Sequence, residues 1–263
     1  MMWFCSLSSG SSGNCIYVGS ERANILVDAG ISGKKIGASL KEIGISAKDI
    51  DCILVTHEHS DHIHGVGVMS RMFNVPIYAN NNTWEAMQGE IGDIKEENIR
   101  VLKNDDPFSI GDIDIKAYSI PHDAADPVGY CFWSGGKKIS IATDMGHVSE
   151  NVLNNIKESD LVLLESNHDV EMLKAGPYPY TLKRRILSST GHLSNDDAGE
   201  TVAKLLNDKY MTVVLGHLSA HNNYPELAYA TVMSILNEHD IKVDRDISIE
   251  LAGRQNVSRF FEL

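Results

Sequence analysis

Several features that define broad protein classes are missing from this sequence. No apolar run approaches the roughly 20 residues that a membrane-spanning helix needs. The apolar first residues have no basic segment before them, so we do not expect a signal peptide. The four cysteines are scattered without a C-x-x-C pair, which argues against a disulfide framework. These absences predict a soluble, cytoplasmic protein without membrane contact, whose cysteines are reduced and lie in the core.

Positive charge is also scarce. The 23 Lys and Arg residues face 36 Asp and Glu residues, which gives a formal net charge of −13 at pH 7. This balance argues against broad electrostatic attraction to nucleic acid, although a local cationic site stays compatible with it. No Pro-rich, low-complexity or highly charged linker divides the sequence, so we predict one domain over residues 1–263.

Strand and helix signals alternate along the chain. Two hairpins are marked by the turn dipeptides at 111–112 and 135–136, and helices are predicted over 180–189 and 196–207, among others. Hairpins with intervening helices in both halves predict two mixed β-sheets packed face to face with helices outside. This is a four-layer αββα sandwich of the α/β (α+β) class. A doubly wound α/β sheet shares several of these features and stays open as an alternative.

The most informative segment follows a buried strand predicted at 52–55. It delivers His57, His59, Asp61 and His62 within six residues. In an extended chain positions i and i+2 point to the same side, so His57 and His59 can bind one metal ion. If the chain then turns, Asp61 and His62 can face a second ion. Imidazole and carboxylate together suit zinc, manganese or iron better than calcium. The alternative is a polar loop that is merely rich in histidine.

Other strands end in side chains of the same kind. A site closed by several segments needs such residues, and one edge of the sandwich would collect them. The residues at or just after predicted strand ends are His122, Asp144, Glu165, His168 and His217. A single histidine at a strand end is usually a satisfied surface group, but several in one chain point to a shared site.

The pattern H-x-H-x-D-H after an apolar strand resembles the signature of the metallo-β-lactamase superfamily. The later His, Asp and His stand in the expected order, and the resemblance covers essentially the whole chain. It implies a metallo-β-lactamase sandwich that binds two divalent metal ions (Zn, Mn or Fe) and no organic cofactor. By position, the implied ligands are His57, His59 and His122 for the first ion, Asp61, His62 and His217 for the second, and Asp144 as the bridging carboxylate.

Within the superfamily the sequence is most similar to the YycJ/WalJ group of small bacterial proteins. The matching segments are 6–15, 121–124 with 127–130, 191–195 and 215–219. This resemblance implies a metal-dependent phosphodiester hydrolase, a DNA 5′→3′ exonuclease that uses a hydroxide activated by two metal ions. DNA would then be its partner.

Other functions on the same fold stay open. A small-molecule (cyclic) phosphodiesterase would suit the bare core equally well, and a thioesterase would use the same metals. Glyoxalase II-like thioesterases usually carry Gly-His where this sequence has Pro121-His122. A flavodiiron-type protein is disfavoured because position 59 is His. Only 47 residues (145–191) separate Asp144 from His192, so the inserted domain of RNA-cleaving β-CASP enzymes is absent. A non-enzymatic metal-storage or regulatory protein is weakened by the complete ligand set.

Further residues are candidates for catalysis and substrate binding. His192 is a candidate general acid or phosphate contact, unless it only caps a helix, and Asp61 could orient the attacking water as well as bind metal. A basic triplet on the predicted helix before His192 either grips backbone phosphates or forms a solvated face. The Ser/Gly run at 8–13 either presents backbone N–H groups to a phosphate or is simply a turn. The substrate-binding candidates are Lys183, Arg184 and Arg185 of the triplet, and His168 and His221, which could equally be structural.

Overall fold

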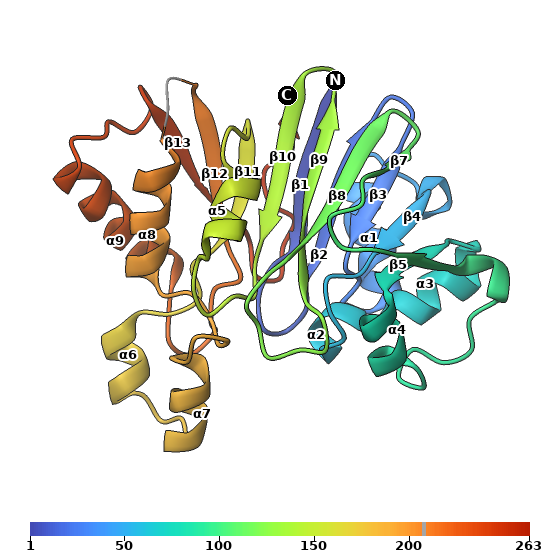
Figure 1. Ribbon diagram of the computed structural model, residues 1–263, viewed down its shortest axis with the longest axis horizontal. Helices are drawn as coiled ribbons and strands as arrows, with labels where there is room; N and C mark the ends of the chain where they lie inside the picture. Colours follow the sequence, from blue (N-terminus) through green and yellow to red (C-terminus); the bar gives the residue numbers. More distant parts are fainter. Residues whose placement is uncertain (207–208) are drawn as a thin grey trace.

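Two β-sheets lie face to face in the computed structural model, which describes residues 1–206 and 209–263 (Figure 1). Within these residues each sheet has seven strands and mixes parallel with antiparallel pairs. The first sheet has the order β14 (Phe261–Glu262), β1 (Met2–Ser8), β2 (Cys15–Ser20), β3 (Asn24–Val27), β4 (Cys52–Leu54), β5 (Ile77–Asn80) and β6 (Ile99–Leu102). The second has the order β13 (Ile247–Leu251), β12 (Met211–Gly216), β11 (Leu161–Glu165), β10 (Lys137–Ala142), β9 (Val128–Ser134), β8 (Ile113–Ser119) and β7 (Phe108–Ile110).

Side-chain alternation along the strands builds the layers. In β1 and β2, Phe4 and Val18 belong to the core between the sheets, whereas Cys5 and Tyr17 belong to a core beneath the helices. Because both faces of these strands are buried, their sequences are mostly apolar and contain no charged residue. All four cysteines are buried free thiols.

Helices cover both outer faces of the sandwich. The first sheet packs against α1 (Gly33–Glu42), α3 (Val66–Phe73) and α4 (Asn81–Met87). The second packs against α5 (Glu150–Ile156), α8 (Asn195–Leu205) and α9 (Pro225–Glu238). The predicted αββα sandwich is therefore confirmed, and the doubly wound alternative is wrong. None of the helices in the described part of the chain combines the length and the apolar content that crossing a bilayer requires.

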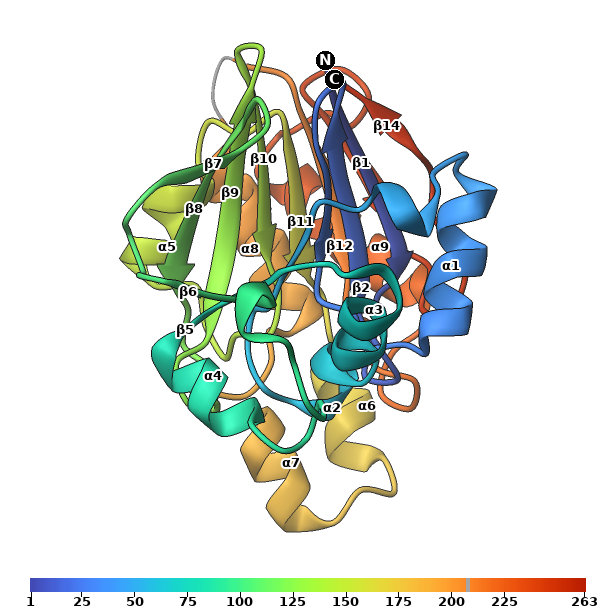
Figure 2. The ribbon, with the colours of Figure 1, turned by 90° about the vertical axis from the view of Figure 1, so that its right-hand side faces the viewer.

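Polar loops gather at one end of the sandwich. Strands β10, β11 and β12 run parallel, so their carboxyl ends meet there. Figures 1 and 2 show α2 (Ser60–Ile63) at this end, together with α6 (Val170–Ala175) and α7 (Tyr180–Ile186), which project beyond the strands. The chain termini lie at the opposite end.

Two helix bounds near this end differ from the sequence prediction. The helix predicted over 180–189 ends at Ile186, and a turn follows in which the His192 N–H donates to the Ile186 carbonyl (3.0 Å). This turn carries His192 back over the sheet. The helix predicted over 196–207 is α8, which ends at Leu205, and position 207 lies outside the described residues. The hairpin turn at 135–136 is confirmed, since both glycines have the positive φ that it requires.

Gly30 allows the loop after β3 to touch the backbone of α2. A Cβ atom at this position would stand 1.6 Å from the Asp61 carbonyl oxygen. Since a backbone carbonyl cannot rotate away, Gly30→Ala is expected to displace Asp61 and to lower the free energy of unfolding by about 1–3 kcal/mol. Urea denaturation measures this change.

Gly37→Ala is the matched control. Gly37 lies inside α1, and a Cβ atom there would meet nothing within 4 Å. Alanine is the better helix former, so this variant should be as stable as the wild type or more stable, by up to about 1 kcal/mol. Equal free energies of unfolding for the two variants would contradict the tight contact at Gly30.

Candidate metal centre and active site

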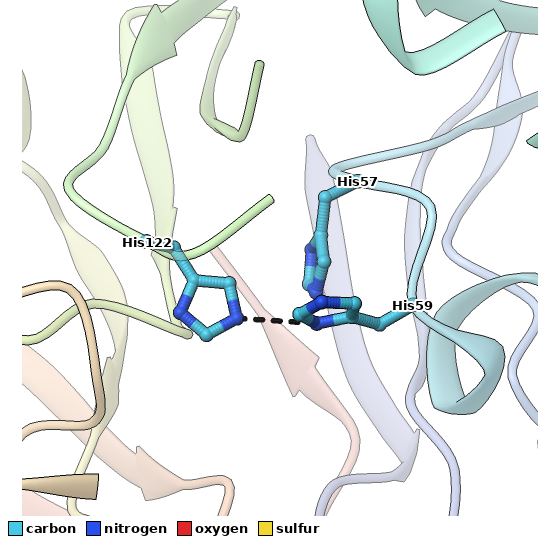
Figure 3. A group of neighbouring side chains, drawn as sticks. All are labelled: His57, His59 and His122. Carbon is cyan, nitrogen blue, oxygen red and sulfur yellow. Dashed lines mark hydrogen bonds between the residues drawn. The ribbon is translucent and has the colours of Figure 1, made fainter. Parts of the chain in front are cut away.

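Three histidines from distant segments face one another at the polar end of the sandwich (Figure 3). His57 and His59 follow β4, and His122 follows β8. Each offers a ring nitrogen, and these atoms lie within 4.8 Å of one another. His122 Nε2 lies 3.3 Å from His59 Nδ1, and the buried His57 Nε2 has no hydrogen-bond partner. The three rings therefore enclose a space in which one cation could be bound.

The surroundings of His57 and His122 keep these two rings neutral. His57 Nδ1 lies 2.9 Å from the Thr56 hydroxyl, and His122 Nδ1 lies 3.1 Å from the Gly191 carbonyl. These bonds leave the Nε2 lone pairs free. Burial, reinforced by the neighbouring imidazoles, holds the pKa of His57 well below its usual value, and burial also lowers the pKa of His122. Neutral imidazole is the form that binds a metal ion.

A second set of donor groups adjoins the first. Asp61, His62 and His217 each bring one donor atom within 4.8 Å of the others. His62 Nε2 lies 3.7 Å from Asp61 Oδ2, and His217 Nε2 lies 3.9 Å from the same oxygen. Asp144 groups both with His57 and His62 and with His217, so its carboxylate lies between the two sets.

Two buried carboxylates, Asp28 and Glu165, to which the sequence analysis assigned no role, orient the second set. Asp28 Oδ2 accepts from His62 Nδ1 (2.7 Å), and its two oxygens also accept from the Thr56 N–H and hydroxyl. Glu165 Oε1 accepts from His217 Nδ1 (2.9 Å). Each bond fixes the tautomer that turns Nε2 of the ring toward Asp61, as carboxylates beyond a metal site commonly do.

The negative charge of the carboxylates around the second set stabilises positive charge beside them. Burial alone would lower the pKa of His62, but Asp144 and Asp28 raise it to about 9. Burial opposes protonation of His217 as well, yet Asp144 and the hydrogen bonds to Asp61 and Glu165 raise its pKa well above the usual value. Without a metal ion these rings would carry the positive charge. A divalent cation satisfies the same carboxylates and leaves the rings neutral.

Unpartnered atoms support the fit between these residues and metal ions. Among the described residues, buried side-chain atoms without a hydrogen-bond partner include His57 Nε2, Asp144 Oδ2 and His217 Nε2. Such atoms are rare in folded proteins unless an ion or water serves them. His62 Nε2 lies 2.9 Å from the Asn14 amide nitrogen, a contact that a cation would replace. The clusters are thus suited to divalent metal ions.

A family model described as the beta-lactamase superfamily domain matches residues 23–217. This segment contains both donor sets. The chain belongs to the metallo-β-lactamase superfamily. Exodeoxyribonuclease YycJ of Bacillus anthracis is 43% identical to it over 246 residues, which cover 94% of this chain and 93% of that protein. Exodeoxyribonuclease WalJ of Streptococcus pneumoniae is 42% identical over 245 residues, covering 92% and 91%. The predicted resemblance to the YycJ/WalJ group is therefore confirmed.

Solved structures show the same superfamily fold at lower identity. YhfI from Bacillus subtilis, a metallo-β-lactamase fold protein, superposes with a TM-score of 0.73 at 15% identity and covers 100% of both chains. Zn²⁺-bound PqqB from Methylobacterium extorquens reaches a TM-score of 0.74 at 15% identity and covers 99% of this chain and all of its own. At such identities the similarity concerns the fold alone.

Both donor sets of this metallo-β-lactamase superfamily member open into one cleft of about 360 Å³. Its residues include His192, whose Nδ1 lies 2.8 Å from Glu165 Oε1. Glu165 thus serves His192 and His217 with the same oxygen. Since Nδ1 is occupied in this way, Nε2 is the His192 nitrogen that remains for a substrate. The cleft is lined by Ser11, His59, Ser60, Asp61, Asp123, Asp144, Asn167, Tyr178, Leu182, Arg185, Ile186, Gly191, His192, His217 and Ser219.

The basic triplet on α7 is divided among three environments. Arg185 lines the cleft and donates to the Asp123 carboxylate. Arg184 lies over the Tyr180 ring (5.9 Å to its centre), and Lys183 Nζ donates to the Lys174 carbonyl of α6 (2.6 Å). Consecutive helical residues point about 100° apart, so one helix cannot turn all three to the same side. Only Arg185 of the triplet is a cleft residue.

The histidine candidates His168 and His221 lie outside the cleft lining. His168 is buried, neither of its ring nitrogens has a partner among the described residues, and burial lowers its pKa to about 4. His221 is exposed and stacks edge-on against Tyr178. In the Ser/Gly run, the Gly10 and Gly13 amides are already bonded within the loop, which favours the turn over the phosphate cradle.

Asp28 directly follows a buried strand, as His217 does, and Asp144 stands one residue further from the end of its strand. The rule that found the other candidates, a polar residue at a strand end, would have found it too. Glu165 stands at the end of its predicted strand. Its role depends on His192, which reaches it through a turn after Ile186, and the sequence predicts helix where that turn begins. Asn14 carries no comparable signal.

Replacing Asp28 tests the orienting role of the buried carboxylates. Asp28→Asn keeps the shape but loses the charge that fixes the His62 tautomer. We expect a 10–100-fold loss of zinc affinity, the usual cost of removing such a partner. Competition with a chromophoric chelator measures the affinity. Asp114→Asn, on the exposed edge of β8, is the control and should bind zinc like the wild type. Equal affinities for the two variants would show that Asp28 has no influence on the metal site.

Proposed function

We propose that this chain is a metal-dependent exodeoxyribonuclease that removes nucleotides from the 5′ end of DNA. The observation that carries the proposal is the pair of adjoining donor sets at one cleft, in a chain 42–43% identical to the two exodeoxyribonucleases over nearly its whole length. Residues 1–263 act as one domain, in the cytoplasm. A small cyclic diester or a thioester is less well supported, since neither YycJ nor WalJ bears such a name.

The metal ligands follow from the two donor sets. His57, His59 and His122 would hold one divalent ion, and Asp61, His62 and His217 would hold the second, with Asp144 available to both. The lowered pKa values of His57 and His122, the unpartnered nitrogens and the central position of Asp144 support this assignment. Zinc, manganese and iron all accept such donors. Divalent ions bound there would lower the pKa of a water molecule and offset the charge of the scissile phosphate.

Two cleft residues act on protons. Asp61, whose side chain is 26% exposed, orients the attacking water with its carboxylate. His192 donates a proton from Nε2 to the leaving oxygen of the sugar. Glu165 supports this step because its Oε1 lies 2.8 Å from Nδ1, which leaves Nε2 as the nitrogen that meets the substrate. Arg185 is the one Lys or Arg among the described residues that line the cleft, and it contacts a phosphate of the DNA.

DNA labelled at either end tests the proposal. The metal-replete protein should release the label of a 5′-labelled strand at once as mononucleotide, while the 3′-labelled strand shortens step by step. Chelation should stop both reactions. Early release of the 3′ label would contradict the polarity, and intact DNA with metal-replete protein would contradict the function itself.

The same assay tests the role of His192. We expect His192→Asn to cleave about 10²–10⁴-fold more slowly, the usual contribution of a general acid, with zinc affinity kept. His239→Asn, at the exposed end of α9, is the matched control and should retain the wild-type rate. Wild-type rates for both variants would remove His192 from the mechanism.

A further inference from the structure

One wall of the cleft is made by α7 and the bend before it. Leu182, Arg185 and Ile186 line the cleft and stand at i, i+3 and i+4, so they share one helix face. Tyr178, just before the helix, lines it as well. This wall differs from the rest of the cleft, where carboxylates, imidazoles and small polar groups prevail.

The segment that carries the wall is fixed in place. Pro177 and Pro179 restrict the backbone on both sides of Tyr178. The Tyr178 ring packs edge-on against His221, with 5.8 Å between ring centres. On the other side, Lys183 Nζ ties α7 to the end of α6. A ring held in this way presents its surface to a ligand at little entropic cost.

Arg185 gives this wall a positively charged side chain. Among the described residues that line the cleft, it is the sole Lys or Arg, while Asp61, Asp123 and Asp144 are acidic. It donates to Asp123, the neighbour of His122, yet its side chain remains 56% exposed. A phosphate entering the cleft can thus reach the guanidinium, which binds such groups in a bidentate manner.

Aromatic, apolar and cationic groups on one wall fit a nucleotide. We propose that this wall is a nucleotide subsite in which Tyr178 stacks on the nucleobase, Leu182 and Ile186 contact its edge or the sugar, and Arg185 binds a phosphate. The inference rests on the proposed function, since it concerns the nucleotide next to the scissile phosphate. A base can stack on Tyr178 only after leaving the helical stack of DNA, so the subsite takes an unpaired terminal nucleotide.

Calorimetry with two small ligands tests the subsite without catalysis. Thymidine 5′-monophosphate and 2-deoxyribose 5-phosphate share the phosphate and the sugar, and only the first has a base. The metal-replete wild type should bind the nucleotide roughly 10-fold or more tightly, as expected for one stacked base. In Tyr178→Ala the two affinities should fall within about twofold of each other, a gap far smaller than stacking gives. Tyr178→Phe should keep the wild-type difference.

Two further variants separate the roles of the wall. Arg185→Gln should weaken both ligands to the same degree, because it removes a phosphate contact. Tyr210→Ala, an exposed tyrosine outside the cleft lining, should behave like the wild type. Equal binding of the two ligands by the wild type would overturn the subsite, as would a base preference that survives Tyr178→Ala.

The DNA assay keeps this inference apart from the proposed function. If the wild type cleaves DNA but does not prefer the ligand with a base, the subsite is wrong and the exonuclease stands. If the base preference holds while DNA stays intact, the cleft binds nucleotides and the exonuclease proposal fails.

Discussion

Buried negative charge governs the polar end of this fold. Asp28, Asp144 and Glu165 are 1%, 2% and 0% exposed, and an isolated buried carboxylate costs several kcal/mol unless partners compensate for it. Asp28 and Glu165 find their partners in backbone amides and in the Nδ1 atoms of His62, His192 and His217. Asp144 lies between the halves, 3.3 Å from His62 Nε2 and 3.2 Å from His217 Nδ1. The positions of the histidines follow from these bonds.

The backbone accommodates this arrangement with local strain. Asp28, Asp144 and His217 have φ values of 59°, 59° and 54°, in the left-handed region that residues other than glycine seldom adopt. Each stands just after a strand, where the chain must bend: Asp144 and His217 line the cleft, and Asp28 binds His62 behind it. Such conformations cost about 1–3 kcal/mol each and persist where the surroundings enforce them. Here the hydrogen bonds of the buried carboxylates provide that enforcement, and the large cores of both sheets supply the stability.

The sequence predicted those features that depend on short stretches of chain, above all the strand ends, which apolar runs locate. Because parallel strands bring their carboxyl ends together, the candidate metal ligands lie together as expected. The division of the basic triplet could not be foreseen, because the direction of each side chain depends on where α7 begins and on what packs beside it. The pairing of Glu165 with His192 depends on a tertiary turn, and His168 is buried for reasons of packing that no spacing expresses. The wall formed by α7 is tied to α6, a helix whose segment shows no clear periodic signal in the sequence.

Locating the metal ions separates most directly the residues that bind metal from the residues that orient those ligands. Anomalous diffraction on both sides of the zinc absorption edge, with crystals of the zinc-loaded protein, locates every zinc ion. Two peaks are expected, one contacted by His57, His59 and His122 and one by Asp61, His62 and His217, with Asp144 between them. Glu165 should then contact neither zinc ion and keep its bonds to the Nδ1 atoms of His192 and His217. A single peak would contradict the two-ion arrangement. A peak within the group formed by Asp144, Glu165, His192 and His217 would also contradict it, because Glu165 would then be a ligand and His192 could not serve as the proton donor.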